Sequence, residues 1–168
     1  MKEMHIETIL KILQNSSELT GEQTHAAHLA QEAARSAYAP YSRFCVGAAL
    51  VLENGEIVTG SNQENGAYPS GLCAERVALF YAGARYPGVA VRLLAIAAVK
   101  DGVLQDVPVS PCGACRQVML ESEHRGGKPM EILLIGANEM HLIGAARDLL
   151  PLPFVLNPAS GTQDSCAP

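Results

Sequence analysis

The chain of 168 residues contains no tryptophan, and aromatic residues of all kinds make up only 5% of it. Positive charge is also scarce: no run of Lys and Arg exceeds two residues, and the net charge is −5. A protein that binds polynucleotides through their phosphates needs clustered positive charge. The composition therefore argues against a nucleic acid partner and favours a small, weakly charged ligand.

Long apolar segments are missing too. No stretch reaches the roughly 20 residues that cross a bilayer, and the start of the chain, Met1–His5, lacks an apolar segment followed by a small-residue cleavage site. We therefore expect no membrane partner and a cytoplasmic protein. The cysteines are five, an odd number, and three lie in short motifs, which argues for reduced thiols and against a secreted disulfide framework.

The length suits one main domain with a buried core. Apolar residues make up 48% of the chain and charged residues 17%, so part of the surface is expected to be buried in an oligomer. We divide the chain into a helical N-terminal extension (1–21), a main domain (22–156) and a flexible tail (157–168).

Helical spacing of Ile6, Ile9, Leu10 and Leu13 predicts a short amphipathic helix over residues 6–14. Thr20 or Thr24 can cap a second helix that runs to about Tyr38. The apolar run 44–53 and the segment 56–61 predict two antiparallel strands joined by Asn54-Gly55, a strong hairpin signal.

The second half of the chain alternates helices and strands. We expect helices over 72–84, 113–123 and 145–150, and strands over 91–99, 131–135 and 140–143. The helix over 72–84 makes the strands on its two sides parallel, whereas the short loop after Ile135 makes the last strand antiparallel. The predicted fold class is α/β: a three-layer α/β/α arrangement with a mixed five-stranded sheet whose last strand is antiparallel.

Cys73-Ala74-Glu75 and Pro111-Cys112-Gly113-Ala114-Cys115 each fall at the start of a predicted helix. A helix N-terminus favours the thiolate that a metal needs. Three thiolates leave the fourth position of a zinc ion open, as in catalytic sites. Glu75 can then take a proton from the zinc-bound water, and Arg76 can offset the negative charge by donating to a ligand sulfur.

Other interpretations of these cysteines stay open. A structural zinc site would need a fourth ligand, for which Cys45 and Cys166 are the available thiols. Redox chemistry at Cys112 and Cys115 alone would leave Cys73 and Glu75 unexplained. Cys45 lies in an apolar strand and is most simply a core residue.

Four motifs resemble the cytidine deaminases, specifically their short-chain, homotetrameric form. The resemblance covers about Glu22 to Phe154, and the motifs are Tyr38-Ala39-Pro40-Tyr41-Ser42-Arg43-Phe44-Cys45-Val46-Gly47-Ala48-Ala49-Leu50, Asn62-Gln63-Glu64-Asn65, Cys73-Ala74-Glu75-Arg76 and Pro111-Cys112-Gly113-Ala114-Cys115-Arg116-Gln117. The resemblance implies zinc-dependent hydrolysis of cytidine and deoxycytidine to uridine and deoxyuridine plus ammonia, with one zinc per subunit.

The resemblance also implies roles for single residues. Cys73, Cys112 and Cys115 would hold the zinc, and Glu75 would move protons between the water, N3 and the leaving amino group. The substrate contacts would come from Asn62 and Glu64 at the ribose, Phe44 beside the base, Ala74 in the pocket, and Phe154 from a neighbouring subunit, with Tyr68 also reaching across.

Three other functions remain as alternatives. A deaminase of a cytosine-bearing antibiotic would not need the Asn62-x-Glu64 pair that the family uses for an unmodified ribose. A polynucleotide deaminase would be expected to carry a helix after Ile135 and more positive charge. A catalytically silent zinc protein would not need Glu75.

Overall fold

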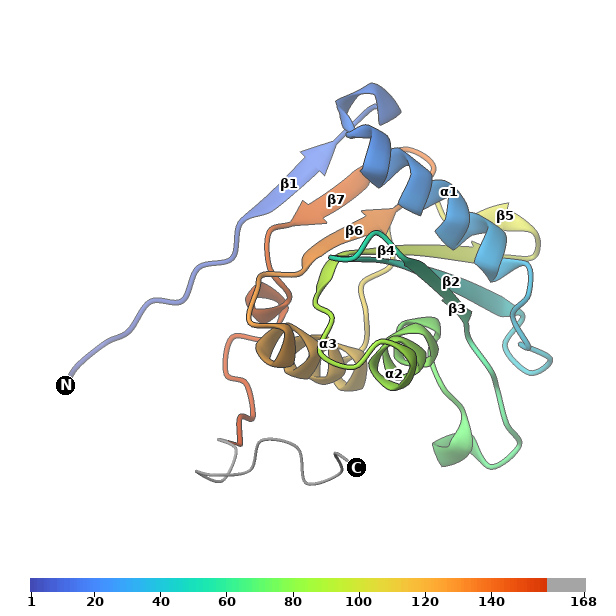
Figure 1. The fold of residues 1–168 in the computed structure, drawn as a ribbon. Helices are drawn as coiled ribbons and strands as arrows, with labels where there is room; N and C mark the ends of the chain where they lie inside the picture. The colour runs from blue at the N-terminus through green and yellow to red at the C-terminus, as the bar shows by residue number, and fades with distance from the viewer. Residues whose placement is uncertain (157–168) are drawn as a thin grey trace.

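A single mixed sheet of seven strands runs through the computed structural model, which describes residues 1–156 (Figure 1). The predicted α/β/α layers are confirmed, but the predicted strand count of five is wrong. The predicted flexible tail, 157–168, lies outside the described residues.

In chain order the elements are β1 Leu10–Leu13, η1 Ser16–Glu18, α1 Gly21–Ala34, β2 Phe44–Leu52, β3 Ile57–Ser61, η2 Tyr68–Ser70, α2 Ala74–Arg85, β4 Val91–Lys100, β5 Val103–Leu104, α3 Gly113–Gly126, β6 Glu131–Ile135, β7 Met140–Ile143 and η3 Ala146–Leu149.

The strands lie in the order β1-β7-β6-β4-β2-β3, and β5 pairs with β4. The predicted hairpin is confirmed, because β2 and β3 pair antiparallel. β2 also pairs antiparallel with β4, so β3 and β4 run in the same direction, as predicted, although β2 separates them. β6 pairs parallel with β4, and β7 pairs antiparallel with β6, as predicted for the last strand.

The predicted helix over residues 6–14 is wrong. Leu10–Leu13 form β1, which pairs antiparallel with β7 and extends the sheet by one strand. A helix this short is marginal in water on its own, and β-branched residues such as Ile9 and Ile12 also suit a strand. The free edge of β7 offers a full ladder of hydrogen bonds, so strand pairing prevails over helical spacing. The division at residue 21 stays a prediction.

Helices cover both faces of the sheet, with α1 on one face and α2 and α3 on the other (Figure 1). The Thr20 hydroxyl caps α1 by accepting from the Gln23 amide, as predicted, but α1 ends at Ala34, before the predicted end near Tyr38. Two glycines allow the helices to lie close to the sheet. A Cβ on Gly47 would lie 2.0 Å from the Ala30 carbonyl oxygen, and one on Gly60 would lie 2.7 Å from the Ala74 carbonyl oxygen.

A buried carboxylate fixes the far end of α3. Glu123 is only 7% exposed. Its Oε2 accepts from the backbone amides of Met130, at 2.9 Å, and Ala146, at 2.7 Å. Its Oε1 lies 3.7 Å from Nε of Arg147. One side chain of α3 therefore binds the residue before β6 and the start of η3.

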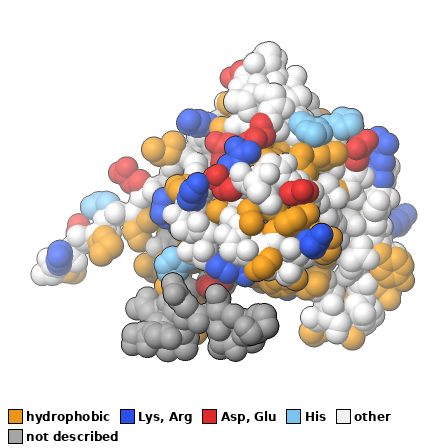
Figure 2. All heavy atoms as spheres, in the orientation of Figure 1, with side chains coloured by type: hydrophobic (Ala, Val, Ile, Leu, Met, Phe, Trp, Pro, Cys, Tyr) orange, Lys and Arg blue, Asp and Glu red, His pale blue; other side chains and the backbone are white. Residues whose placement is uncertain are grey.

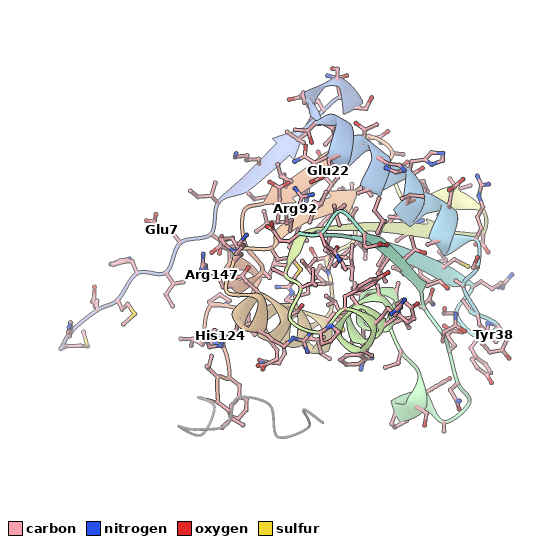
Figure 3. The ribbon with its side chains drawn as sticks, in the orientation of Figure 1. Glu7, Glu22, Tyr38, Arg92, His124 and Arg147 are labelled. Atoms are coloured by element: carbon pink, nitrogen blue, oxygen red, sulfur yellow. The ribbon has the colours of Figure 1, made fainter. Side chains whose placement is uncertain are left out.

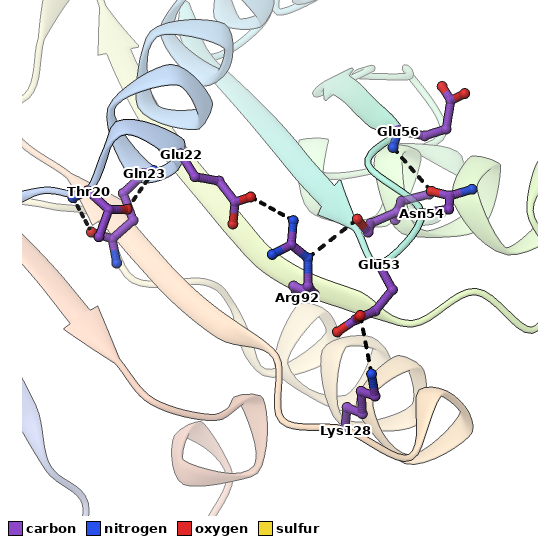
Figure 4. Close-up of polar contacts among 9 residues, drawn as sticks. Thr20, Glu22, Gln23, Glu53, Asn54, Glu56, Arg92 and Lys128 are labelled. Carbon is purple, nitrogen blue, oxygen red and sulfur yellow. Dashed lines mark hydrogen bonds and ion pairs between the residues drawn. The ribbon is translucent and has the colours of Figure 1, made fainter.

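At the edge where β2 ends and β4 begins, charged side chains join the layers (Figure 4). Arg92 of β4 donates to Glu22 of α1 at 2.6 Å and to the Leu52 carbonyl at 3.5 Å. Lys128 lies 3.2 Å from Glu53. The carboxyl ends of β3 and β4 lie at the opposite edge of the sheet, where α2 and α3 begin.

The face drawn in Figure 2 mixes acidic, basic and hydrophobic side chains, without a block of one charge. Within residues 1–156, none of the helices combines the length and the apolar character that crossing a membrane requires.

Candidate active site

Two helix starts meet beyond the carboxyl ends of β3 and β4. Cys73 is the N-cap residue of α2 and Cys112 that of α3, while Cys115 lies in the first turn of α3. Cys73 therefore precedes its helix, where the sequence predicted that it lies one residue inside. The three sulfurs all lie within 4.8 Å of one another, and Sγ of Cys112 is 3.5 Å from Sγ of Cys115. The convergence predicted from the sequence is confirmed.

The pKa values of two of the thiols, Cys73 and Cys115, shift in opposite directions. The hydrogen bond from Cys115 is the main cause that lowers the pKa of Cys73 to about 5; burial opposes the shift and Arg76 supports it. The same contact with Cys73, together with burial, raises the pKa of Cys115. One thiolate thus forms at the expense of its neighbour, and a divalent cation would supply the charge that the set lacks.

The donors fit zinc. Three sulfurs that share one small volume are the ligands zinc prefers, and a three-ligand set leaves one position for water or substrate. Arg76 supports them, because its Nη2 lies 3.9 Å from Sγ of Cys73 and also donates to the Gly71 carbonyl. Its buried Nε has no hydrogen-bond partner among the described residues. The half-buried guanidinium group of Arg76 places a positive charge beside the thiol of Cys73, which favours the thiolate.

Glu75 lies in the first turn of α2 and is only 4% exposed. Burial is the largest cause that raises the pKa of its carboxyl group, and the charge of Cys73 raises it further. A carboxyl group with a raised pKa exchanges protons more readily near neutral pH than one in water. This environment suits a proton carrier.

A cavity of about 280 Å³ opens beside Cys73. Of the residues predicted for the site, it is lined by Asn62, Glu64, Tyr68, Cys73 and Arg76, and the rest of its lining is Gln63, Asn65, Gly71 and Leu72. The structure thus brings the loop 62–65, which carries the predicted ribose contacts Asn62 and Glu64, next to Cys73.

The side chains of Asn62 and Glu64 also hold the start of β2. Oδ1 of Asn62 accepts from the Val46 amide at 2.7 Å, and Nδ2 donates to the Phe44 carbonyl at 3.0 Å. Glu64 accepts from the backbone amides of Tyr41 and Ser42 and from the Ser42 hydroxyl. Asn62 therefore holds the backbone of Phe44, and Glu64 holds the two residues Tyr41 and Ser42 that precede it, tasks that the sequence did not reveal.

These contacts also set the charge of Glu64. The hydrogen bond from the Ser42 side chain, followed by that from the Tyr41 amide, lowers the pKa of the carboxyl group. A lowered folded-state pKa means that the ionised form stabilises the loop above the pKa of the unfolded chain, and that this contribution is lost as the pH falls through the folded-state pKa. Glu64 is therefore an anion at neutral pH.

One tyrosine, Tyr68, lines the cavity, and two more, Tyr38 and Tyr41, contact residues of its lining. Tyr38, at the end of the molecule opposite Glu7 (Figure 3), binds the loop through its backbone: its carbonyl accepts from the Glu64 amide at 2.8 Å, and its amide donates to the Asn62 carbonyl at 3.0 Å. The rings of Tyr41 and Tyr68 meet edge to face at 6.3 Å. Sequence reasoning gave Tyr38 and Tyr41 no individual role, although both lie in a motif that it singled out, and that motif was the available signal.

Three predicted substrate contacts lie outside the cavity lining. Ala74 is buried under Gly60. Phe44 begins β2 and is half-buried. Phe154 is 67% exposed and follows η3, away from the residues that line the cavity of its own chain.

Comparison with known proteins identifies the family of the chain. The family described as "Cytidine and deoxycytidylate deaminase zinc-binding region" matches residues 21–126, which include the three cysteines and Glu75. A cytidine deaminase of Halalkalibacterium halodurans is 50% identical over 90 residues, 54% of this chain and 64% of the relative. One of Mycobacterium tuberculosis is 43% identical over 128 residues, 76% of this chain and 86% of the relative. The matched region thus spans less than two thirds of the first relative.

Solved structures agree with the sequence matches. The crystal structure of a cytidine deaminase from Burkholderia pseudomallei is similar with a TM-score of 0.68 and 39% identity, covering 81% of this chain and all 100% of that one. A cytidine deaminase from Mycobacterium tuberculosis gives a TM-score of 0.64 at 35% identity, covering 82% of this chain and 100% of the other. Sequence, fold and the three-cysteine cluster therefore agree: the chain belongs to the cytidine and deoxycytidylate deaminase family and carries its zinc-binding region.

Proposed function

We propose that the protein catalyses the hydrolytic deamination of cytidine and deoxycytidine to uridine and deoxyuridine plus ammonia, as in pyrimidine salvage. The observation that carries this proposal is the gathering of three sulfurs within 4.8 Å, next to a cavity lined by Asn62 and Glu64. The buried carboxyl group of Glu75 adds the proton carrier that the reaction needs. The names of the related proteins support the same reaction.

Cys73, Cys112 and Cys115 are the residues that would hold one zinc ion. When bound, zinc supplies Lewis acidity, which makes a water molecule a nucleophile at neutral pH. Three thiolates bring more negative charge than zinc neutralises, and Arg76 offsets part of it through its contact with Cys73. The α2 and α3 N-termini add their partial positive charge.

Glu75 moves the two protons of the attacking water. Its carboxylate accepts one and delivers it to N3 of the pyrimidine ring, while the oxygen adds to C4. It then passes the second proton to the amino nitrogen, the C4–N bond breaks and ammonia leaves. Uridine keeps the oxygen at C4 and one proton at N3, so the atoms balance. Burial of Glu75 supports this role, because its raised pKa eases each transfer.

The other residues predicted to contact the substrate bind the nucleoside, both those that line the cavity and those beside it. Glu64 accepts from a ribose hydroxyl, with Asn62 beside it. Phe44 packs beside the base, in the position that Asn62 fixes through the backbone. Tyr68 closes the mouth of the cavity together with Tyr41. Ala74 contributes to substrate binding through its position as the first residue of α2.

We further propose a homotetramer in which Phe154 completes the pocket of a neighbouring subunit. The exposure of several large apolar side chains supports an interface: Phe80 (51%), Tyr81 (56%), Leu152 (84%) and Phe154 (67%). A cytoplasmic enzyme that uses a free nucleoside, without nucleic acid or membrane partners, agrees with the net charge of −5.

An ultraviolet assay with cytidine, deoxycytidine, cytosine and blasticidin S tests the function. We expect turnover of the two nucleosides, and zinc near one per subunit in the same sample. Glu75→Ala should keep the zinc but lower kcat by at least about 10³-fold, because proton transfer contributes on the order of 10²–10⁴-fold. Turnover of blasticidin S alone, or full activity of Glu75→Ala, would refute the proposal.

A further inference from the structure

The residues that follow Cys115 connect the cysteine cluster to the C-terminal segment. Nε of Arg116 donates to the Pro111 carbonyl at 2.8 Å, and its Nη1 donates to the Leu149 carbonyl at 3.0 Å. One guanidinium group thus joins the loop before Cys112 to the end of η3. A lysine could not hold both carbonyls, because it lacks the fixed fork of donors.

Gln117 makes a second connection. Its Nε2 donates to the Phe154 carbonyl at 2.8 Å. Arg116 and Gln117 are both half-buried, and the lining of the cavity beside Cys73 includes neither of them. They therefore hold the backbone of the C-terminal segment in place and do not contact a ligand in the cavity of their own subunit.

The segment between these two contacts is stiff. It contains Pro151 and Pro153, each of which fixes its own φ near −65° and disfavours helical geometry at the residue before it. A short segment with few free torsions, held at both ends, presents its next side chain in a defined direction. That side chain is Phe154, and its ring is exposed while its backbone is bound.

We infer that Arg116 and Gln117 are positioning residues that set nucleoside affinity by fixing Phe154 for the pocket of a neighbouring subunit. The inference rests on the proposed function. The same helical turn that carries Cys115 thereby places the aromatic ring, so metal site and pocket wall are fixed by one element. The effect falls on binding, because Phe154 moves no proton.

Because the chain contains no tryptophan, the position of residue 154 can be followed by fluorescence, independently of activity. Phe154→Trp introduces a single indole whose fluorescence reports the surroundings of residue 154. In this background, Gln117→Ala should increase acrylamide quenching by about 2-fold or more, because the segment loses one anchor. Gln117→Glu keeps the shape but lacks the N–H donor and should behave like Gln117→Ala. Glu121→Ala, at an exposed position of the same helix, is the matched control and should change nothing.

Kinetics on the otherwise unchanged chain test the effect on affinity. Loss of one hydrogen bond should raise KM for cytidine by roughly 3- to 10-fold, with kcat and zinc content nearly constant. Arg116→Lys should raise KM at least as much, because it releases the segment at its other end. A merely structural role would lower thermal stability without this split between KM and kcat.

Mixed tetramers show in which subunit the segment acts. When Gln117→Ala subunits are assembled with Glu75→Ala subunits, some intact sites receive Phe154 from a correctly anchored segment. A fraction of the active sites should then show the KM of the unchanged protein. A KM that stays raised in the mixture would overturn the action across subunits.

The outcomes separate this inference from the proposed function. If the unchanged protein does not deaminate cytidine, the proposed function fails while the quenching result still stands on its own. Unchanged quenching in Gln117→Ala overturns the positioning role. Increased quenching with an unchanged KM overturns the role in affinity.

Discussion

Glu64 illustrates how much one side chain does at this site. It lines the cavity, and it also receives three hydrogen bonds from Tyr41 and Ser42. Loss of its carboxylate would therefore remove the proposed acceptor for the ribose and also loosen the segment before Phe44. The two effects differ in their substrate dependence, since only the first requires a ribose.

Glu64→Ala should reduce kcat/KM for cytidine and deoxycytidine by about 10- to 100-fold more than for free cytosine, the range expected for one hydrogen bond to a charged group. Ser42→Ala is the matched control, because it removes a partner of Glu64 and leaves the carboxylate in place. Steady-state rates for all three substrates decide the matter. An equal loss for the three would contradict a ribose contact.

Sequence reasoning reached the cysteines, Glu75 and Arg76 because short motifs at helix starts carry their chemistry. It did not predict the hydrogen bonds between the Asn62 side chain and the backbone of Phe44 and Val46, which lie 18 and 16 residues away along the chain. An amide side chain can bond with equal ease to a sugar or to a backbone strand. Only the folded loop decides between these partners.

At the scale of elements, the strongly patterned segments were predictable and the short ones were not. β2, β4 and β6 are buried apolar strands, and the crossover rule fixed the direction of their neighbours. β1 and β5 are four and two residues long, respectively. Their identity depends on a partner edge, which local sequence does not encode. The turn before β5 uses positive φ at Asp101 (51°) and Gly102 (82°), which an Asp-Gly pair favours.

α3 depends on Glu123 in a way that a substitution can measure. Glu123→Ala leaves the buried amides of Met130 and Ala146 without their acceptor, which should lower the free energy of unfolding by roughly 2 to 4 kcal/mol. Glu121→Ala, exposed on the same helix, should change it by no more than about 0.5 kcal/mol. Urea unfolding of both variants gives the comparison, and equal stabilities would show that Glu123 is dispensable.

At the scale of the whole molecule, the ring of Phe154 is exposed in the single chain, so the proposed shared pocket would make activity depend on assembly. On dilution, the specific activity of the protein should fall in parallel with the fraction of tetramer, and a saturating nucleoside should restore both, since ligand that binds the assembly stabilises it. Sedimentation velocity combined with assay at matched concentrations measures this. A monomer with full activity would exclude the shared pocket.

β1 has a further consequence, which concerns solubility. Each strand at the rim of a sheet exposes unpaired backbone groups that can recruit another molecule. β1 covers the apolar strand β7 and replaces it at the rim by four residues with Lys11 among them. A variant without residues 1–13 should therefore aggregate when concentrated, which light scattering would detect. Lys11→Ala in the full chain keeps β1 and should aggregate less than this truncated variant. If so, the residues before the family match protect the sheet from self-association by pairing with β7.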